Sequence, residues 1–409
     1  MRFKVRFLFV SIAIVSLFGL WLLPKEKPDQ IATFSAFPPR KRDEFASFYR
    51  KRRESACASP STELFYQSWR HHNVKGKLLH VSDDMFRLVL SDYCLTSDVR
   101  TVRPDNVIAA TAFSDNEHFI EARDLLRSFR KCLPNKKIVV VDMGLPPAQA
   151  LELQSLCNVI YHKFEFEKYP EFIHIILEYR FKPLIVHAVL FDKWSLLGYK
   201  PDAVLWVDSS IRFLCKDSQD KFDDMWRLTV QEADETGVAW GYPQHHKIFF
   251  FAPLSTLRYF PTMLQDLDRP QFGAGCILVS RSQRNLDSIL MWWTACALDP
   301  NCMLDKTDPQ EPWYTGDAFV SLGGAAHRNC MSHNVYLETV LMWLHSRFNR
   351  LFPIERSSRL HCSRTDQTVL NLLWVGAYGR RRLVPPLIQV SRIPTSMYDD
   401  SVLTRCIKS

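Results

Sequence analysis

The sequence predicts an α/β fold with a mixed, mostly parallel sheet and helices on both of its faces. Short apolar runs bounded by turn residues alternate along the chain with longer segments whose apolar residues recur at helical spacing. One run, 203–207, is apolar throughout, which is typical of a strand buried on both faces. With 409 residues, 47% of them hydrophobic, the chain is long enough to bury a large core.

Four strands and three helices are predicted to alternate between residues 107 and 207. The strands are 107–112, 137–142, 159–161 and 203–207, and the helices between them are 118–131, 146–156 and 179–196. Strands that alternate with helices form a parallel sheet with helices on both faces. The carboxyl ends of such strands share one edge, where open α/β sheets bind ligands.

The flanking segments follow a less regular pattern. Strands are predicted at 238–241, 273–279 and 383–390, and helices at 222–234, 284–298, 336–348 and from 366 onward. Upstream, two short strands are predicted at 78–81 and 85–90. These two would belong to a small subdomain that precedes the main sheet.

Residues 7–23 form an uncharged apolar run that follows Arg2, Lys4 and Arg6. A helix of this length spans about 25 Å, which suits a thin bilayer. Its end lacks the small residues of a cleavage site, which favours an uncleaved signal anchor over a cleaved signal peptide. Positive residues stay on the cytoplasmic side, so the rest of the chain is expected in a lumen.

The predicted organisation has six parts. They are a cytoplasmic tail at 1–6, a transmembrane signal anchor at 7–23, a stem at 24–60, a small subdomain or stem extension at 61–105, a main lumenal domain at 106–395 and a tail at 396–409. The stem is rich in proline and basic residues and shows no helical or strand period. Its basic run at 50–53 is interpreted as solvated charge, with a processing site as the alternative.

Charge and motifs exclude several classes of protein. The net charge of +8 is mild and lies largely near the N-terminus, without a long basic helix or interleaved aromatic residues. A nucleic-acid partner is therefore not expected. The glycine-rich fingerprints of Rossmann dinucleotide sites and of P-loops are also absent.

Asp208 follows the buried strand 203–207 and is the first candidate for a functional residue. A carboxylate at the carboxyl end of a parallel strand can hold a divalent cation or a ribose hydroxyl. The alternative is that Asp208 only caps the next turn. A second candidate is the run 273–275, because glycine at a strand often marks the close approach of a ligand or another backbone.

Three segments in this order resemble motifs of glycosyltransferases with the GT-A fold. The segment 206–210 resembles the Asp-x-Asp motif, and 272–278 resembles the Asn-Ala-Gly strand of the retaining glycogenin-like and galactosyltransferase-like group. The segment 366–371 resembles the Asp-Gln-x-x-Leu-Asn motif of the same group. The resemblance covers roughly residues 105–375.

The chain more closely resembles an uncharacterised animal family of type II, single-pass membrane proteins that are glycosyltransferase-like. In that family, segments similar to 111–114, 179–184 and 362–367 recur. This resemblance implies a GT-A-like sheet and a Golgi or other secretory-pathway membrane, with the catalytic domain in the lumen. It implies a hexosyltransferase that moves a sugar from a nucleotide-sugar donor, most often a UDP-sugar, to a glycan, glycoprotein or glycolipid acceptor.

The same resemblance implies roles for individual residues. Asp366 and Gln367 would be catalytic and lie near the reacting carbon of the donor sugar. Asp208 would hold Mn²⁺ or Mg²⁺, which neutralises charge on the leaving diphosphate. The remaining donor-binding candidates are Arg180, Lys182, Ser210, Gly273, Ala274, Gly275 and Asn371. As alternatives, the two basic side chains are solvated helix charges and Asp366 is a helix N-cap.

Departures from the family pattern leave two other functions open. Ser210 replaces the second aspartate, Gly273 replaces the asparagine, and no histidine follows Asp366 to serve as a metal ligand. The domain could therefore be a catalytically inactive binding module. A methyltransferase that uses S-adenosylmethionine is the third hypothesis, because Val139–Gly144 resembles the start of such a site.

All 11 cysteines lie beyond the predicted anchor. In a secretory lumen many would form disulfides. Cys296 and Cys302 flank a short loop and are the predicted pair. An odd number leaves at least one cysteine unpaired or intermolecular, and Cys276 on a buried strand is the candidate for a free thiol.

Overall fold

The structure is a computed structural model, and a defined part of the chain is described here. The described residues are 39–95, 101–114, 116–215, 219–241, 243–248, 252–303, 365–378 and 390–391. The predicted anchor at 7–23, the predicted helix at 336–348 and the tail at 396–409 lie outside these residues. Within the described part of the chain, no helix combines the length and the apolar character needed to cross a membrane.

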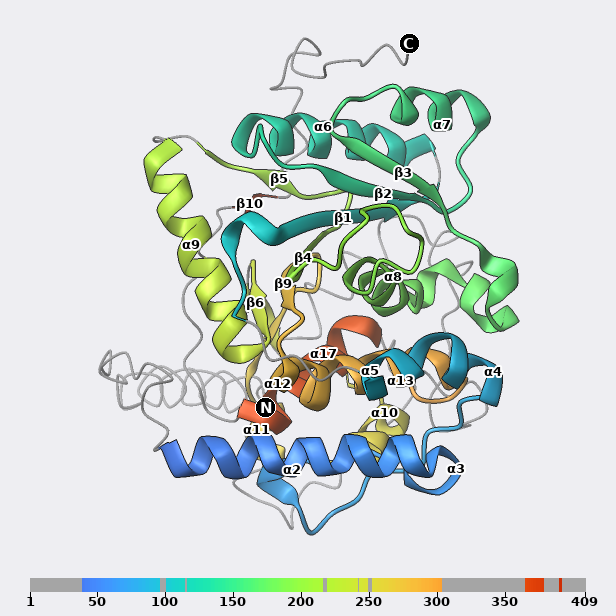
Figure 1. Ribbon diagram of the computed structural model, residues 1–409, viewed down its shortest axis with the longest axis vertical. Coiled ribbons are helices and arrows are strands. Elements are labelled where there is room, and N and C mark those ends of the chain that lie inside the picture. The colour runs from blue at the N-terminus through green and yellow to red at the C-terminus, as the bar shows by residue number, and fades with distance from the viewer. Residues whose placement is uncertain are drawn as a thin grey trace, which may run out of the picture. The chain divides into compact units, whose positions relative to one another are not determined.

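A six-stranded sheet with the order β3-β2-β1-β4-β9-β6 lies at the centre of the fold (Figure 1). Its strands are β1 (Val107–Phe113), β2 (Ile138–Asp142), β3 (Val159–Lys163), β4 (Ala203–Val207), β6 (Val238–Trp240) and β9 (Cys276–Ser280). The first four strands are parallel, whereas β9 pairs antiparallel with both β4 and β6. The prediction of a mixed, mostly parallel sheet is confirmed.

Helices cover both faces of this sheet. Alternate residues of the strands, such as Ala109, Val140 and Leu205, belong to the core that contains residues of α6 (Asn116–Cys132) and α9 (Gln219–Thr236). The helix α8 (Phe181–Leu190) contacts β4, and Figure 1 shows it on the side of the strands opposite α9. Both sets of side chains are buried because successive side chains of a strand point to opposite faces.

A second apolar layer packs beyond α8. It consists of α12 (Gln283–Asn285), the π-helical turn η9 (Leu286–Leu290), α13 (Met291–Leu298) and α17 (Thr365–Tyr378). The side chains of Trp292, Trp293 and Trp374 are almost completely buried in it. This layer brings α17, from a distant part of the chain, into contact with α13, which also contacts α8.

The expectation of an irregular stem is wrong for residues 39–58, which form the helix α2 (Pro39–Ala58). The buried positions Phe45, Tyr49, Arg53 and Ala56 recur at helical spacing. Arg53 Nε lies 2.9 Å from Asp287 Oδ1, so this residue of the basic run is an ion-paired part of the core. The many charges of α2 hid this pattern in the sequence.

The two strands predicted at 78–81 and 85–90 are also wrong. Residues 78–81 have no regular structure, and the apolar run lies in α4 (Asp83–Met85) and the π-helical turn η3 (Phe86–Leu90). Short apolar runs do not distinguish a strand from a buried helix. The region also contains α3 (Pro60–Glu63), η2 (Trp69–His71), α5 (Ser91–Leu95) and η4 (Pro104–Asn106).

The remaining elements are short. They are α7 (Pro147–Gln154), η5 (Phe166–Lys168), η6 (Glu171–His174), η7 (Ile176–Glu178), β5 (Arg212–Phe213), β7 (Pro243–Lys247), α10 (Leu254–Tyr259), α11 (Leu264–Leu267), β8 (Pro270–Phe272) and β10 (Val390–Ser391). β5 pairs with β10, and β7 pairs with β8. The helix predicted at 179–196 is shorter than expected, because α8 ends at Leu190.

Three disulfides join described cysteines. They are Cys57–Cys94, Cys132–Cys215 and Cys296–Cys302, the last being the pair expected from the sequence. Cys276 is a buried free thiol on β9, and burial raises its pKa to about 12, with a further contribution from Asp208. This thiol is therefore protonated and unreactive at neutral pH.

We predict that Arg53→Met lowers the free energy of unfolding of the full chain by about 3 kcal/mol, because it leaves the buried carboxylate of Asp287 without its ion-pair partner. Urea denaturation measures this change. Lys51→Met, on the exposed face of the same helix, is the matched control and should change stability little. Equal stability of the two variants would show that α2 is not anchored through Arg53.

Candidate active site

Lys182, in the first turn of α8, lies where three distant segments of the chain meet. Its Nζ is 2.8 Å from Asp366 Oδ2 and 3.2 Å from Asp208 Oδ1. It also donates a hydrogen bond to the backbone oxygen of Ala274 at 3.2 Å. The ammonium is thus held by two ion pairs and one hydrogen bond.

The pairing of β4 with β9 explains why two of these segments meet. β9 runs antiparallel to β4, so the residues that precede β9 lie beside those that follow β4. Asp208 N donates to Gly275 O at 2.8 Å, which extends the pairing by one residue. The Asp208 side chain is fixed by the indole of Trp206, whose Nε1 donates to Oδ1 at 2.7 Å. It remains 29% exposed, so a ligand can reach it.

The helix α17 supplies the third segment and holds the turn before β9. Asn371 Nδ2 donates to Phe272 O at 2.9 Å, and Phe272 N donates to Asn371 Oδ1 at the same distance. Ala274 N donates to Gln367 Oε1 at 3.4 Å. Asp366 is already a helical residue in the first turn of α17, which excludes the N-cap alternative. Gln367 and Asn371 therefore position the turn 272–275 against the Lys182 ammonium.

The ammonium of Lys182 is buried and strongly held in its charged form. Burial alone would lower the pKa of this group, but the carboxylates of Asp208 and Asp366 outweigh burial and raise the pKa well above its usual value. One ammonium between two ionised carboxylates leaves one net negative charge in the cluster. Such a cluster attracts hydroxyl donors and stabilises positive charge that develops nearby.

Gln367 adds a donor to this cluster. Its side chain is 4% exposed, and among the described residues its Nε2 has no hydrogen-bond partner. Buried amide nitrogens are normally bonded. The amide nitrogen of Gln367 is therefore a buried donor for which the described residues supply no acceptor.

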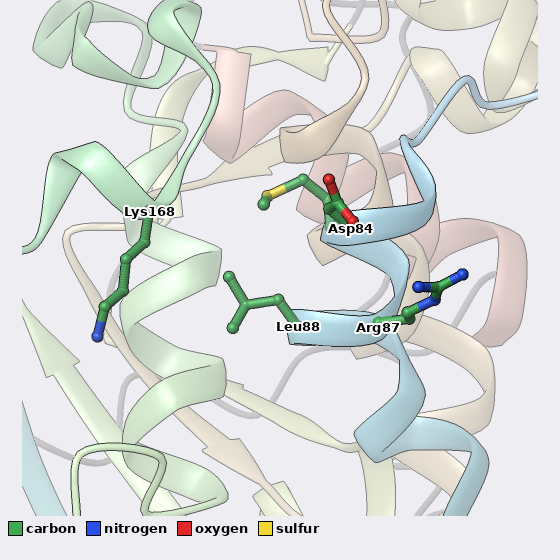
Figure 2. Close-up of a pocket in the computed structure, with 5 residues that line it drawn as sticks. Asp84, Arg87, Leu88 and Lys168 are labelled. Atoms are coloured by element: carbon green, nitrogen blue, oxygen red, sulfur yellow. The ribbon is translucent and has the colours of Figure 1, made fainter.

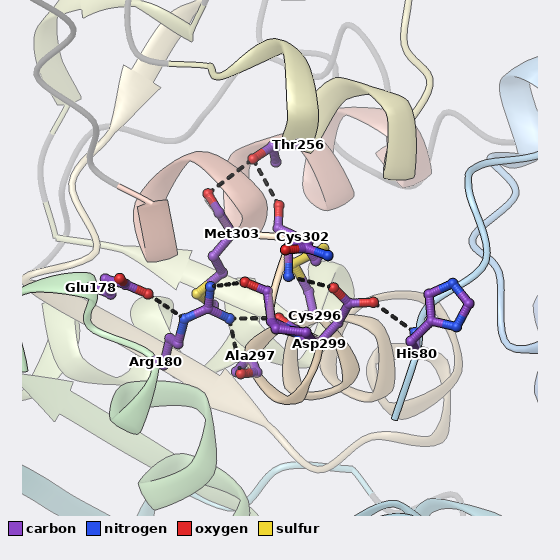
Figure 3. Close-up of a disulfide and its surroundings, with 11 residues drawn as sticks. His80, Glu178, Arg180, Thr256, Cys296, Ala297, Asp299, Cys302 and Met303 are labelled. Atoms are coloured by element: carbon purple, nitrogen blue, oxygen red, sulfur yellow. Dashed lines mark hydrogen bonds and ion pairs between the residues drawn. A yellow bond between two sulfur atoms is a disulfide. The ribbon is translucent and has the colours of Figure 1, made fainter. Parts of the chain in front are cut away.

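Arg180 does not join this cluster, and its predicted role in donor binding is corrected. Its guanidinium is ion-paired with Glu178 at 2.6 Å and donates to the backbone oxygens of Ala297, Asp299 and Pro300. Figure 3 shows it aimed at the loop that the Cys296–Cys302 disulfide closes. Arg180 therefore fixes this loop to the start of α8, although it stands only two residues from Lys182.

Ser210 lies in the turn that follows Asp208. Ile211 N donates to Asp208 O at 3.0 Å and closes this turn. The adjacent Ser209 Oγ donates to Glu121 Oε2 at 3.1 Å, so Ser209 is directed toward α6. Ser210 offers at most a neutral hydroxyl to a cation, a weak replacement for a carboxylate.

The described residues do not fit a divalent metal ion. Asp208 Oδ1 already contacts two donors, the ammonium of Lys182 and the indole of Trp206. Among the described residues, no group of three or more histidine, cysteine, aspartate or glutamate side chains could hold a metal ion. The ammonium occupies the position between the two carboxylates that a cation would take.

Two aromatic residues at the site were not assigned a role from the sequence. Trp206 fixes Asp208, and Tyr179 has a left-handed backbone with φ of 54° and a ring centroid 5.5 Å from Lys182 Nζ. Tyr179 is 38% exposed. Strained, non-glycine backbone tends to occur at functional sites. The sequence indicated these residues only by their positions, because Trp206 lies in the segment 206–210 and Tyr179 in the segment 179–184.

A surface pocket lies away from these residues (Figure 2). Its lining residues are Asp84, Met85, Arg87, Leu88 and Lys168. Leu88 of η3 and Lys168 of η5 face one another across it. None of the predicted site residues belongs to this pocket, so it is not the candidate active site.

The segment that suggested a methyltransferase, Val139–Gly144, consists of the end of β2 and the turn that follows it. Asp142 ends β2, and its Oδ1 accepts hydrogen bonds from the backbone N–H groups of Gly144 and Leu145 at 2.7 and 2.6 Å. Tyr161 donates to the other oxygen. Gly144 has φ of 120°, which glycine adopts without strain. These contacts account for Val139–Gly144 without a ligand.

Comparisons with known proteins give limited matches. A family model described as a protein of unknown function (DUF1647) matches residues 66–187, which includes Lys182 but neither aspartate of the cluster. No curated protein matches the chain.

Among solved structures, the galactosyltransferase LgtC in complex with donor and acceptor sugar analogues is 13% identical, over 65% of this chain and 70% of that chain, with a TM-score of 0.30. The apo structure of the bifunctional glycosyltransferase WbbM is 16% identical, over 49% of this chain and 36% of that chain, with a TM-score of 0.27. At these scores we base neither the fold nor the function on the likeness.

We predict that Asn371→Leu lowers the free energy of unfolding by about 2 kcal/mol, because it leaves the N–H and C=O of Phe272 unpaired. Amide exchange at Phe272 should become faster, as measured by hydrogen exchange and mass spectrometry. Asn301→Leu is the matched control, because the bond between Asn301 and Asp299 uses the Asn301 backbone. Unchanged exchange at Phe272 in Asn371→Leu would show that α17 does not hold the turn.

Proposed function

We propose that this chain is a glycosyltransferase, which moves a sugar from a nucleotide-sugar donor to a hydroxyl group of an acceptor. One observation carries the proposal. The segments 206–210, 272–278 and 366–371 resemble three motifs of such enzymes, and they meet at the ammonium of Lys182. They do so at the carboxyl end of β4, the edge of an α/β sheet where ligands bind.

The chemistry of the cluster suits this reaction. The bond between the sugar carbon and the phosphate oxygen breaks, and its electron pair leaves with the nucleoside diphosphate. A bond from the acceptor oxygen to the same carbon forms, and the acceptor proton passes to the leaving phosphate or to water. Positive charge develops on the sugar ring meanwhile, and the carboxylates of Asp208 and Asp366 stabilise it.

Sugar hydroxyls have matching partners in the same cluster. The exposed part of Asp208 accepts hydrogen bonds from hydroxyls, and the buried amide nitrogen of Gln367 is a donor with no acceptor among the described residues. Glutamine cannot act as a general base, so Gln367 orients the sugar. Asp366 and Gln367 are thus the residues that we place nearest to the reacting carbon.

The finer assignment extends the resemblance stated above. We propose hexosyl transfer from a UDP-sugar to a glycan, glycoprotein or glycolipid, in a Golgi or other secretory-pathway lumen, with residues 7–23 as the single membrane span. The disulfides Cys57–Cys94 and Cys132–Cys215 support an oxidising compartment. Cys157 is also disulfide-bonded.

A catalytically inactive, sugar-binding domain is the second candidate. The observation that favours it is that the Lys182 ammonium is already held by protein oxygens, in ion pairs with Asp208 and Asp366 and in a hydrogen bond to Ala274 O. Carboxylates held in this way can bind sugar hydroxyls without turnover. Sugar or nucleotide binding without release of nucleoside diphosphate would favour this second function.

We predict that the full-length protein in detergent releases nucleoside diphosphate from at least one of a panel of UDP- and GDP-sugars. Asp366→Asn should reduce that release about 100-fold or more, because it removes a charge that stabilises the transition state. The exposed Asp268, whose side chain is 65% exposed, gives the matched control Asp268→Asn.

The control should retain the activity of the wild type, and circular dichroism should show that both variants are folded. Absence of turnover and of nucleotide binding across the whole panel would contradict the proposal. Turnover that survives unchanged in Asp366→Asn would contradict the role assigned to this carboxylate.

The proposed orientation in the membrane gives a separate prediction. Protein synthesised in the presence of microsomes should resist added protease beyond the anchor, and should become sensitive when detergent opens the vesicles. Digestion of residues 39–303 in intact vesicles would contradict the lumenal assignment. Immunoblotting for a C-terminal tag measures the outcome, and an endogenous lumenal protein serves as the control.

A further inference from the structure

We infer that Lys182 takes the place of a divalent cation, so that the site works without Mn²⁺ or Mg²⁺. The inference rests on the proposed function as far as turnover is concerned, whereas the statement about cation binding stands on the contacts of Lys182 alone. It concerns the position between the carboxylates of Asp208 and Asp366, which the fold brings together at this edge of the sheet.

The position between the two carboxylates is filled. Lys182 Nζ lies within hydrogen-bond distance of Asp208 Oδ1 and of Asp366 Oδ2. A magnesium or manganese ion bound to Asp208 would lie about 2 Å from its oxygen. It would then face a fixed positive charge at close range, and the two cations would repel one another.

The ammonium has no alternative position. Every residue of α8 from Phe181 to Leu190 is buried, and the side chain of Lys182 is 4% exposed. Moving the charge away from both carboxylates would leave it unpaired in the protein interior, which is strongly unfavourable. Lys182 therefore does not give way to a metal ion.

The remaining ligands are also unsuited to a metal ion. Asp208 Oδ1 accepts from the indole of Trp206 as well as contacting Lys182. Ser210 stands where a second carboxylate would be expected, and it offers only a hydroxyl.

The structure also indicates what removal of the lysine would do. Without the ammonium, Asp208 and Asp366 would become two uncompensated carboxylates, and the backbone oxygen of Ala274 would lose its hydrogen-bond donor. Carboxylate and carbonyl oxygens are the ligands that hard divalent cations prefer. A metal site should therefore appear when Lys182 is shortened.

Titration of the full-length protein with MnCl₂, followed by electron paramagnetic resonance of free Mn²⁺, tests this inference. Wild type should bind no stoichiometric Mn²⁺, and neither should Lys200→Ala, which removes an exposed lysine outside the site. Lys182→Ala should bind one ion per chain with an affinity about tenfold or more above that of wild type, as expected when a competing positive charge is removed. The double variant with Asp208→Asn should lose this gain.

The outcomes separate the inference from the proposed function, because the Mn²⁺ signal does not depend on turnover. Stoichiometric Mn²⁺ binding by wild type that disappears in Asp208→Asn would overturn the inference. So would a folded Lys182→Ala protein that binds no more Mn²⁺ than wild type.

If Lys182→Ala does not fold, the comparison of wild type with Asp208→Asn decides. Equal absence of bound Mn²⁺ supports the inference, and binding in wild type alone overturns it. In a preparation that turns over a donor, activity should persist in EDTA. Loss of activity in EDTA with full recovery in Mn²⁺ would overturn the inference while leaving glycosyl transfer intact.

Discussion

The buried ammonium of Lys182 is the constraint on which the rest of the site depends. A charge in the protein interior must be paired and hydrogen-bonded, or it destabilises the fold. Lys182 satisfies this requirement with Asp208, Asp366 and the backbone of Ala274, each from a different segment of the chain. The end of β4, the turn before β9 and the start of α17 therefore all contact the same nitrogen atom.

Around this nitrogen, the motif residues divide into those that hold the backbone and those that remain available to a ligand. Asn371 pairs with both backbone groups of Phe272, and Arg180 fastens the loop after α13. Asp208 and the amide nitrogen of Gln367 keep unused capacity for hydrogen bonds. The exposed group among them is the carboxylate of Asp208, an acceptor that suits the hydroxyls of a sugar.

The sequence predicted the sheet well because the evidence for strands such as 107–112 and 203–207 is local. It missed the helix α2 because the buried face of that helix includes Arg53, which becomes a core residue only through Asp287. It also grouped Arg180 with Lys182. The two side chains start from neighbouring positions, and only the packing of α8 against α13, and of α13 against α17, directs them to different partners. The pairing of Lys182 with Asp366 could not be predicted, because it depends on how the second helical layer docks.

The central claim is that an ammonium, and not a metal ion, lies between Asp208 and Asp366. A crystal structure of the full-length protein with UDP and MnCl₂, with diffraction recorded at the manganese absorption edge, measures this most directly. The account predicts density for the Lys182 side chain between the two carboxylates and no anomalous peak beside Asp208. An anomalous peak bound to Asp208, with the Lys182 side chain displaced, would contradict it.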